Sequence, residues 1–513
     1  MWLWGLMTAS RRRPGELESR HASIDLAELA HATSLECAPD QLRGRCVLVL
    51  TRDPLTAGLA LIELDGLARR IVLWPPDLGR EHLPAVMDMA GVDAWVTDGG
   101  GGDAAGEHEE GGTGAAFAGG SAAAESGTVE AVVRPSLIPL RGDRRVSHET
   151  EWVLLTSGTT GEPKLVLHTL ATLTSAVRRQ PVPAGPGALQ TGPVVWGTFY
   201  DIRRYGGLQI FLRAMLSGSL VLPKPSEAAP DYLTRAAAAG VTHISGTPSH
   251  WRRALMSGAA AAIAPRYVRL SGEIADQAIL DGLRAVYPAA AVAHAFATTE
   301  AGVAFEVGDG LAGFPSALIG SRREGDVELR VEEETLRVRS PGNALRYLGD
   351  GVPPIRGEDG FVDTGDRVKL EEGRYHFVGR RGGVVNVGGL KVHPEEVEAV
   401  INDHPWVRMS LVRPRRNPIT GAVVAADVVL AEVAPPGRSE AAPVGRAEVM
   451  SAGLAIDTAA AARCGERPPD DVLRREIIEH CRRRLAPHKV PAMIRFVPAL
   501  EVSGSGKLLR REG

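Results

Sequence analysis

The chain has 513 residues, which exceeds the length of one ordinary domain and predicts at least two structural units. Apolar residues make up 44% of the chain and charged residues 23%, a composition typical of a globular protein and not of a disordered one. With 58 basic and 62 acidic residues, the net charge of -4 speaks against general attraction to nucleic acid and favours a small metabolite as partner.

The sequence contains four cysteines: Cys37, Cys46, Cys464 and Cys481. They form neither a CxxC pair nor a disulfide framework, so we expect buried free thiols. No run of about 18 apolar residues occurs, and no membrane span is expected. The apolar residues 1–7 precede the arginines at 11–13, whereas a secretory signal places its positive charge first. We therefore expect a cytoplasmic protein.

In the first part of the chain, short apolar runs alternate with amphipathic runs. Strands are expected at 45–50, 71–74 and 94–97, and helices at 57–70 and 83–90. This alternation predicts an α/β fold with a largely parallel sheet. It resumes after residue 151, with further strands expected at 194–199, 219–222, 241–245, 268–271 and 291–296.

From about residue 327 the pattern changes to short β-hairpins. Pro394 then opens a predicted helix, whose acidic first turn suits the positive end of the helix dipole. We place a large N-terminal domain at 1–380 and a small C-terminal domain at 381–513. Two tracts of low complexity, at about 99–127 and about 434–470, cannot bury enough apolar surface to order themselves and are interpreted as insertions.

A loop rich in glycine and hydroxyl residues follows the strand-like run 151–156. It reads Thr156-Ser157-Gly158-Thr159-Thr160-Gly161-Glu162-Pro163-Lys164, and a helical stretch is expected to begin near Leu165. Such a backbone approaches phosphate oxygens closely, its amides and hydroxyls donate hydrogen bonds, and Lys164 adds a cation. The loop is not a Walker motif, because Pro163 separates Gly161 from Lys164. The segment therefore predicts a phosphate-binding site.

From this loop onward the chain resembles the superfamily of adenylate-forming enzymes, which includes acyl-CoA synthetases, adenylation domains and luciferases. The resemblance implies a large AMP-binding domain with layered sheets and helices, followed by a small mobile α+β domain. It also implies ATP and Mg²⁺, with the glycine-rich loop closing over the β- and γ-phosphates.

A second segment resembles the family's aromatic-Gly-x-Thr-Glu motif and reads His294-Ala295-Phe296-Ala297-Thr298-Thr299-Glu300. The resemblance implies that Ala295 and Phe296 lie against adenine, that Thr299 contacts phosphate, and that Glu300 holds magnesium. A carboxylate suits this last role, because Mg²⁺ prefers hard oxygen ligands that it shares with phosphates. Phe296 replaces the family's usual tyrosine.

Two further turns are similar to nucleotide contacts of the family. Gly272 and Glu273 follow a predicted strand and resemble the turn beside adenine. Asp366 ends the segment Gly-Phe-Val-Asp-Thr-Gly-Asp and resembles the aspartate that accepts hydrogen bonds from both ribose hydroxyls. An exposed aspartate in a β-turn is the structural alternative for Asp366.

The last part of the chain resembles the mobile domain of the family. Arg380 matches the hinge arginine that reaches the nucleotide, although Gly382 stands where the family usually has an acidic residue or lysine. Gly388 and Gly389 resemble the loop that lines the thiol tunnel. Lys507, preceded by Ser-Gly-Ser-Gly, resembles the catalytic lysine of adenylation.

The resemblance implies an acid–thiol ligase. The carboxylic acid attacks the α-phosphorus of ATP, pyrophosphate leaves, and a thiol then takes the acyl group from AMP. Lys507, Lys164 and Mg²⁺ near Glu300 would stabilise the charge that develops on the phosphoryl oxygens. By resemblance, the small domain turns about residues 380–383 between the two steps.

Coenzyme A is the first candidate for the thiol, and the phosphopantetheine of a carrier protein is the alternative. A third hypothesis is an inactive homologue that only binds nucleotide. The intact motifs at Lys164, Glu300, Asp366 and Lys507 argue against it. We expect a monomer or a homodimer. A metal hydrolase is poorly supported, because His243 and His250 show no ligand-like clustering.

The acyl pocket of relatives lies near residues 196–208 of this chain. Arg204 stands where many relatives have a histidine or aromatic gate. One hypothesis is that Arg203 or Arg204 meets a polar or second carboxylate group of the acid. The alternative is an arginine that pairs with Asp201 or with phosphate. Asp201 is out of register with the family's amine-binding aspartate, which speaks against an α-amino acid substrate.

Overall fold

The computed structural model divides the chain into two compact units. The large unit comprises Met1–Phe377 with Val502–Lys507, and the small unit comprises Val378–Glu501 with Leu508–Gly513. The structure describes residues 2–9, 15–20, 22–99, 128–141, 144–157, 162–179, 192–224, 227–320, 327–349, 351–387, 390–417, 421–431, 467–502 and 507–509. The two predicted insertions lie almost entirely outside these residues.

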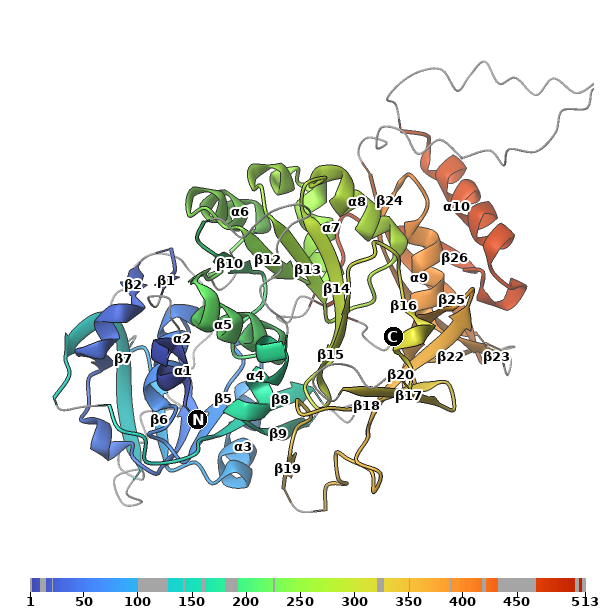
Figure 1. Cartoon of the computed structure of the whole chain (residues 1–513). Helices are drawn as coiled ribbons and strands as arrows, with labels where there is room; N and C mark the ends of the chain where they lie inside the picture. Colours follow the sequence, from blue (N-terminus) through green and yellow to red (C-terminus); the bar gives the residue numbers. More distant parts are fainter. Residues whose placement is uncertain are drawn as a thin grey trace, which may run out of the picture. The chain divides into compact units, whose positions relative to one another are not determined.

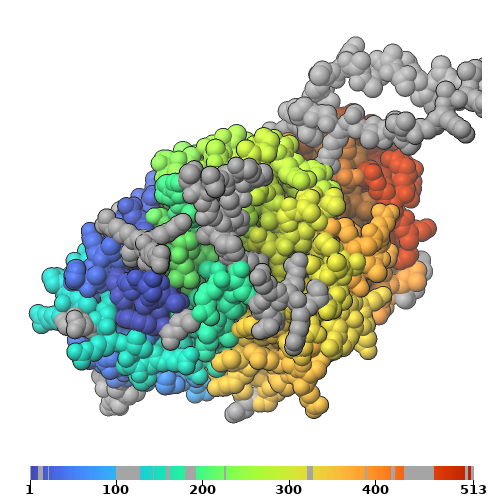
Figure 2. Space-filling view, in the orientation of Figure 1, coloured from blue at the N-terminus to red at the C-terminus, as the bar shows by residue number. Residues whose placement is uncertain are grey.

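The first sheet of the large unit has eight strands in the order β19-β9-β8-β5-β4-β6-β7-β3. Its strands are β3 (Ala32–Leu35), β4 (Cys46–Val49), β5 (Arg70–Leu73), β6 (Ala94–Thr97), β7 (Val129–Pro139), β8 (Glu151–Ser157), β9 (Pro163–Thr169) and β19 (Arg346–Leu348). The five strands from β8 to β7 pair in parallel, as the alternating pattern predicts. The outer pairs are antiparallel. In Figure 2 the blue segment near residue 30 lies beside the cyan segment near residue 135, in agreement with the pairing of β3 with β7.

The second sheet also has eight strands, in the order β15-β14-β13-β12-β10-β11-β1-β2. Its strands are β1 (Glu16–Glu18), β2 (Ser23–Asp25), β10 (Val195–Thr198), β11 (Ser219–Val221), β12 (His243–Gly246), β13 (Tyr267–Ser271), β14 (Ala291–Thr298) and β15 (Gly302–Val307). From β1 to β14 the pairs are parallel. The carboxyl ends of these strands therefore share one edge, where open α/β sheets place their ligands.

Helices separate and cover the two sheets (Figure 1). Between them lie α1 (Leu3–Ala9), α2 (Pro54–Leu64), α4 (Leu170–Arg179) and α5 (Tyr205–Ser217), which share one apolar core with both sheets. Helix α3 (Leu83–Ala90) packs on the outer face of the first sheet. Helices α6 (Ala229–Ala238), α7 (Pro248–Met256) and α8 (Gln277–Val286) cover the outer face of the second. All eleven residues of α2 are buried, as a helix between two sheets requires.

One sequence prediction is wrong at β9. We expected a helix from about Leu165, but Pro163–Thr169 is a strand and the helix α4 starts at Leu170. The strand pairs with β8 on one side and with β19 on the other. A short apolar run reads alike as a buried strand or a buried helix, and here the pairing with two distant partners decides.

A third sheet completes the large unit, with strands in the order β16-β21-β20-β18-β17. These are β16 (Phe314–Pro315), β17 (Glu328–Glu332), β18 (Thr335–Arg339), β20 (Val362–Glu371) and β21 (Arg374–Arg380), the last of which runs into the small unit. The pairs β17–β18 and β18–β20 are antiparallel, as the predicted hairpin pattern requires.

The small unit is an α+β unit with its own core. Its sheets are β22-β23 and β24-β25-β26. Its elements are β22 (Val385–Val387), β23 (Leu390–Val392), α9 (Pro394–Asn402), β24 (Val407–Asn417), β25 (Gly421–Leu430), α10 (Asp470–Arg484) and β26 (Met493–Phe496). Helix α9 begins at Pro394, and Glu395 and Glu396 occupy its first turn.

The sequence predicted buried free thiols and no membrane span, and the described residues bear on both predictions. Cys37, Cys46 and Cys481 are free, and burial raises the pKa of both Cys46 and Cys481 to about 11. These two thiols are therefore protonated and unreactive at neutral pH. Among the helices that the structure describes, none combines the length and the apolarity of a membrane span.

Candidate active site

The β8–β9 hairpin carries the predicted phosphate loop. Strand β8 ends at Ser157 and β9 starts at Pro163, and Thr156 pairs directly with Lys164 across the hairpin. The Lys164 side chain is exposed, so its ammonium can reach a ligand. Gly158, Thr159, Thr160 and Gly161 lie outside the described residues, as does the side chain of Ser157.

The predicted metal carboxylate lies in the turn between β14 and β15. Three hydrogen bonds fix this turn: Thr298 Oγ1 accepts from the Ala301 amide at 2.9 Å, the Glu300 carbonyl accepts from the Ala344 amide at 2.8 Å, and the Thr299 carbonyl lies 2.8 Å from His168 Nε2. Thr299 and Glu300 are half-buried. The backbone that carries both predicted residues is therefore held by β9 and by the segment before β19.

Tyr347 lies between the two predicted groups. Its hydroxyl donates to Glu300 Oε1 at 3.2 Å, and Lys164 Nζ lies 5.4 Å from the centre of its ring. Figure 1 shows β19, which carries Tyr347, at the edge of the first sheet beside β9. The structure thus brings Lys164 and Glu300, which are far apart in sequence, to one site. No sequence motif singled out Tyr347, since a tyrosine in a short strand has no local signature.

His168 supports the same turn from β9. It is fully buried, and burial lowers its pKa to about 4, so the imidazole is neutral at pH 7. Because a carbonyl oxygen can only accept, Nε2 carries the proton that binds the Thr299 carbonyl. Its Nδ1 lies 2.9 Å from Thr172 Oγ1. His168 therefore acts as a neutral donor, a role that the sequence did not indicate.

The residues near Glu300 suit a magnesium ion that is held mainly by phosphates. Within the described ranges, no group of three or more His, Cys, Asp or Glu side chains gathers as a metal cage. Magnesium keeps several water ligands and binds through one or two carboxylates and the phosphates of its substrate. Glu300, beside the Lys164 cation, offers the single hard oxygen ligand that such an arrangement needs.

Gly272 lies at the carboxyl end of β13 and has a φ of +89°. Lys507 belongs to the large unit, and its Cε lies 3.5 Å from where a Cβ at Gly272 would stand. Thr247 Cγ2 lies 3.7 Å from the same point. The predicted adenylation lysine therefore passes over the predicted adenine turn, although 235 positions separate the two residues in sequence.

Glu273 is occupied by a local role. Its carboxylate accepts from the Ser249 amide at 2.9 Å and from Ser249 Oγ at 3.0 Å. These bonds satisfy the first turn of α7, where the helix dipole favours a negative charge. The nucleotide contact predicted for this residue stays a prediction.

The remaining predicted nucleotide residues lie on strands. Ala295 is buried on β14, opposite Ser271 of β13. The ring of Phe296 is half-buried and stacks on Phe377 at 4.9 Å between centroids. Asp366 is half-buried on β20, and its amide donates to Thr364 Oγ1.

Of the residues predicted for the mobile domain, Arg380 lies in the small unit, whereas Lys507 belongs to the large unit. Arg380 is exposed at the end of β21. Gly379, just before it, has a φ of +130°, and a Cβ there would stand 2.6 Å from Glu395 Oε2. Gly388 and Gly389 lie outside the described residues.

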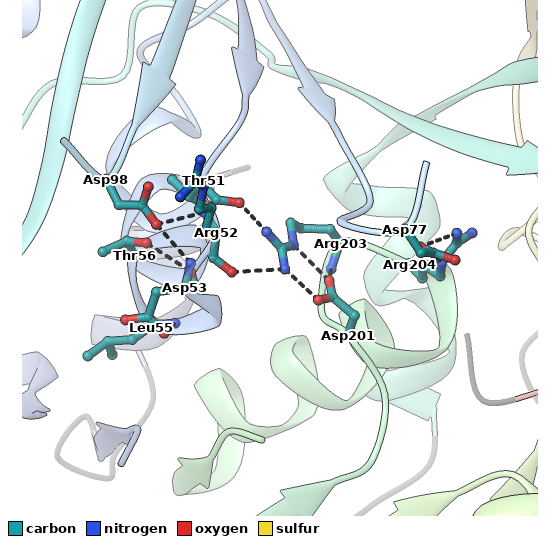
Figure 3. Close-up of polar contacts among 10 residues, drawn as sticks. All are labelled: Thr51, Arg52, Asp53, Leu55, Thr56, Asp77, Asp98, Asp201, Arg203 and Arg204. Atoms are coloured by element: carbon teal, nitrogen blue, oxygen red, sulfur yellow. Dashed lines mark hydrogen bonds and ion pairs between the residues drawn. The ribbon is translucent and has the colours of Figure 1, made fainter. Parts of the chain in front are cut away.

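The acyl-pocket arginines are engaged in ion pairs (Figure 3). Arg203 is fully buried, and its guanidinium donates to Asp201 Oδ1 at 2.8 Å and to Oδ2 at 2.5 Å. It also donates to the carbonyls of Thr51 and Arg52, which follow β4. The pairing alternative for Arg203 therefore holds, and this side chain connects the start of α5 to the first sheet.

Arg204 points to the other side and pairs with Asp77, its Nε lying 3.1 Å from Oδ1 (Figure 3). Contact with the acid would require Arg204 to leave this carboxylate. Both oxygens of Asp201 accept from Arg203, which gives this carboxylate a structural role. The sequence suggested Asp201 or phosphate as partners and did not indicate Asp77, because Asp77 follows a strand of the other sheet.

Two family models match the chain. The model described as AMP-binding enzyme matches residues 71–344, which is more than half of the 513 residues. The model described as AMP-binding enzyme C-terminal domain matches residues 433–507. The first match includes Lys164 and Glu300, and the second ends at Lys507.

Several curated proteins are similar in sequence. The 2-succinylbenzoate–CoA ligase of Salmonella typhimurium is 31% identical over 300 residues, which cover 54% of this chain and 60% of that protein. The human mitochondrial acyl-coenzyme A synthetase ACSM1 is 30% identical over 191 residues, which cover 37% of this chain and 27% of that protein. The chain thus spans less than two thirds of these relatives.

Solved structures share the fold over nearly the whole chain. The anthranilate CoA ligase AuaEII in complex with anthranoyl-AMP has a TM-score of 0.72 at 17% identity, covering 99% of this chain and 95% of its own. The o-succinylbenzoate CoA synthetase of Bacillus subtilis, in complex with its acyl-adenylate, has a TM-score of 0.66 at 18% identity, covering 99% and 96%. These likenesses establish a layered α/β unit followed by a small unit.

Proposed function

The chain belongs to the AMP-binding enzyme family, and on that premise we propose that it activates a carboxylic acid with ATP and passes the acyl group to a thiol. The acid attacks the α-phosphorus of ATP, an acyl-adenylate forms, and pyrophosphate leaves. The thiol then attacks the acyl carbon, its proton is lost, and AMP leaves with the electron pair of the broken C–O bond.

One observation carries the proposal: Lys164 and Glu300, predicted from separate motifs, both contact Tyr347. A cation and a hard oxygen ligand at one place are what a magnesium triphosphate requires. A lysine that merely followed a plain surface loop would have no reason to share Tyr347 with a carboxylate from the other sheet.

Each residue of the site has a chemical task in the first step. Lys164 and the amides of the glycine-rich loop bind the outer phosphates. Lys507 stabilises the negative charge that develops on the α-phosphoryl oxygens. Glu300 would hold Mg²⁺, which neutralises phosphate charge when bound. Thr299 would add a hydroxyl to the phosphates, and His168 fixes its backbone.

Coenzyme A is the acceptor that we propose first. The matched curated proteins are named as CoA ligases and acyl-coenzyme A synthetases, and this favours a free thiol over a carrier protein. The phosphopantetheine of a carrier protein is the second candidate, because its thiol is chemically the same group.

The test is pyrophosphate release from ATP and Mg²⁺ across a panel of carboxylic acids, with and without coenzyme A. The panel includes 2-succinylbenzoate and anthranilate, which the names of similar proteins suggest, together with short and medium-chain fatty acids. Glu300→Gln serves as the site control, because it keeps the shape of the side chain and removes the charge that a metal needs.

Acid-dependent release in the wild type, with a thioester formed only when coenzyme A is present, supports the proposal. Release that depends on the acid but forms no thioester with coenzyme A favours the carrier-protein acceptor. Absence of release with every acid, together with unimpaired ATP binding, contradicts the ligase and favours the inactive homologue.

A further inference from the structure

We propose that Tyr347 is a positioning residue that keeps the Glu300 carboxylate and the Lys164 ammonium apart and oriented toward a magnesium triphosphate. The inference rests on the proposed adenylating function. It assigns a role to a side chain that lies outside every motif described above.

Strand register places the Tyr347 ring beside Lys164. In the antiparallel pair of β19 and β9, Tyr347 stands opposite Val166. Lys164 lies two residues before Val166 and therefore shares the same face of the strand. Diagonal neighbours across an antiparallel pair are within reach of aromatic and long side chains. The 5.4 Å between Lys164 Nζ and the ring centre is within the range of a cation–π contact.

The hydroxyl at the other end of the ring orients Glu300. It donates to Oε1 at 3.2 Å. The Glu300 backbone is already fixed, because its carbonyl accepts from the Ala344 amide at 2.8 Å. With the backbone held and one oxygen bound, the carboxylate has a defined direction, which a metal ligand requires.

Tyr347 also contacts two opposite charges, that of Lys164 and that of Glu300. Among the ion pairs within 4.0 Å in the described part of the chain, none joins Lys164 to Glu300, and both groups contact Tyr347 instead. A direct ion pair would neutralise both groups and compete with the magnesium triphosphate for each of them. Tyr347 contacts the cation with its face and the carboxylate with its hydroxyl, so both charges are retained for the ligand.

The experiment measures binding of a fluorescent ATP analogue to the full chain while Mg²⁺ is titrated, with a parallel titration in EDTA. It needs no acid, so it is independent of the substrate panel. Tyr347→Phe keeps the ring and removes the hydroxyl, and Tyr347→Leu removes both. Tyr287→Phe is the matched control, because its buried hydroxyl also donates one hydrogen bond, to the Ala260 carbonyl at 2.6 Å.

We expect Tyr347→Phe to raise the Mg²⁺ concentration for half-saturation about tenfold, as loss of a hydrogen bond to a charged group predicts. Its affinity for the analogue in EDTA should change less than about twofold, because the ring still holds Lys164. Tyr347→Leu should in addition weaken binding in EDTA about threefold, because Lys164 can then pair with Glu300. Tyr287→Phe should change both constants by less than about twofold.

A Mg²⁺ dependence of Tyr347→Phe that matches Tyr287→Phe overturns the inference. So does an equal loss of affinity with and without Mg²⁺, because that result assigns the hydroxyl a general structural role. Failure of the wild type itself to bind the analogue contradicts the proposed function, and the inference falls with it.

Discussion

Removal of the Asp201 carboxylate is expected to destabilise the large unit by about 3–5 kcal/mol. The Arg203 side chain has no exposed surface, and that of Asp201 is 12% exposed. Asp201→Ala therefore leaves a buried guanidinium without its counter-charge, and the carbonyls of Thr51 and Arg52 do not replace that charge.

Asp77→Ala provides a matched control, because it removes the same kind of partner from Arg204. In that pair, the side chains of Arg204 and Asp77 are 22% and 27% exposed. Water can solvate the released Arg204 guanidinium, so the expected cost is about 0.2–1 kcal/mol. The two variants remove the same kind of carboxylate partner from an arginine, and they differ in how deeply that ion pair is buried.

The assay is the melting temperature of the full chain, followed by tryptophan fluorescence. At about 2 °C for each kcal/mol, Asp201→Ala should melt about 6–10 °C below the wild type and Asp77→Ala about 2 °C or less below it. The double variant Asp201→Ala with Arg203→Met should recover much of the loss, because an apolar pair leaves no buried charge. A loss for Asp201→Ala no larger than for Asp77→Ala would refute the reasoning.

Three further predictions concern Lys507, His168 and the start of the small unit. Lys507→Ala should lower the rate of acid-dependent pyrophosphate release about 10²- to 10³-fold. Lys489 pairs with Glu396, and its replacement by alanine should leave the rate near that of the wild type. Comparable rates for the two variants would contradict the role of Lys507. Because the pKa of His168 falls from about 6.5 unfolded to about 4 folded, the unfolded chain binds more protons between these values. Stability should therefore decrease as pH falls from about 6.5 to about 4, and urea unfolding of His168→Asn should show a shallower decrease than the wild type; an unchanged pH profile would contradict this. Gly379→Ala should destabilise the small unit by about 1–3 kcal/mol in thermal melting, because Gly379 has a positive φ and an added Cβ would clash with Glu395. Gly382→Ala should be near neutral, because an added Cβ there would meet nothing within 4 Å. Equal losses of stability for the two variants would contradict the argument.

The sequence predicted most elements of the large unit because its patterns are local. The strands at 45–50, 71–74 and 94–97 and the helix at 83–90 all appear within one or two residues of their expected bounds. It failed at β9, whose apolar run Leu165–Leu167 has no distinctive period. That segment became a strand because β8 and β19 hydrogen-bond to both of its edges.

The site divides in the same way between sequence and tertiary structure. Lys164, Glu300 and Lys507 could be proposed as site residues from short motifs, because the charge of each residue type suits phosphate or magnesium, and their roles stay predictions. Tyr347 and His168 could not, because their roles depend on which groups lie opposite them after strand pairing. The same holds for Arg204, whose partner Asp77 was not among the alternatives that the sequence offered, whereas Arg203 pairs with Asp201 as one alternative proposed.

The sequence by itself therefore determined the α/β class, and it predicted which residues form the candidate site. Only the tertiary structure decided which charged side chains form ion pairs inside the fold and which remain available to a ligand. Arg203 is bound to Asp201 in the interior, whereas Lys164 and Glu300 both contact Tyr347. The physical reason is that hydrogen bonds and ion pairs act over a few ångströms, and residues from distant strands reach that distance only once the sheets have formed.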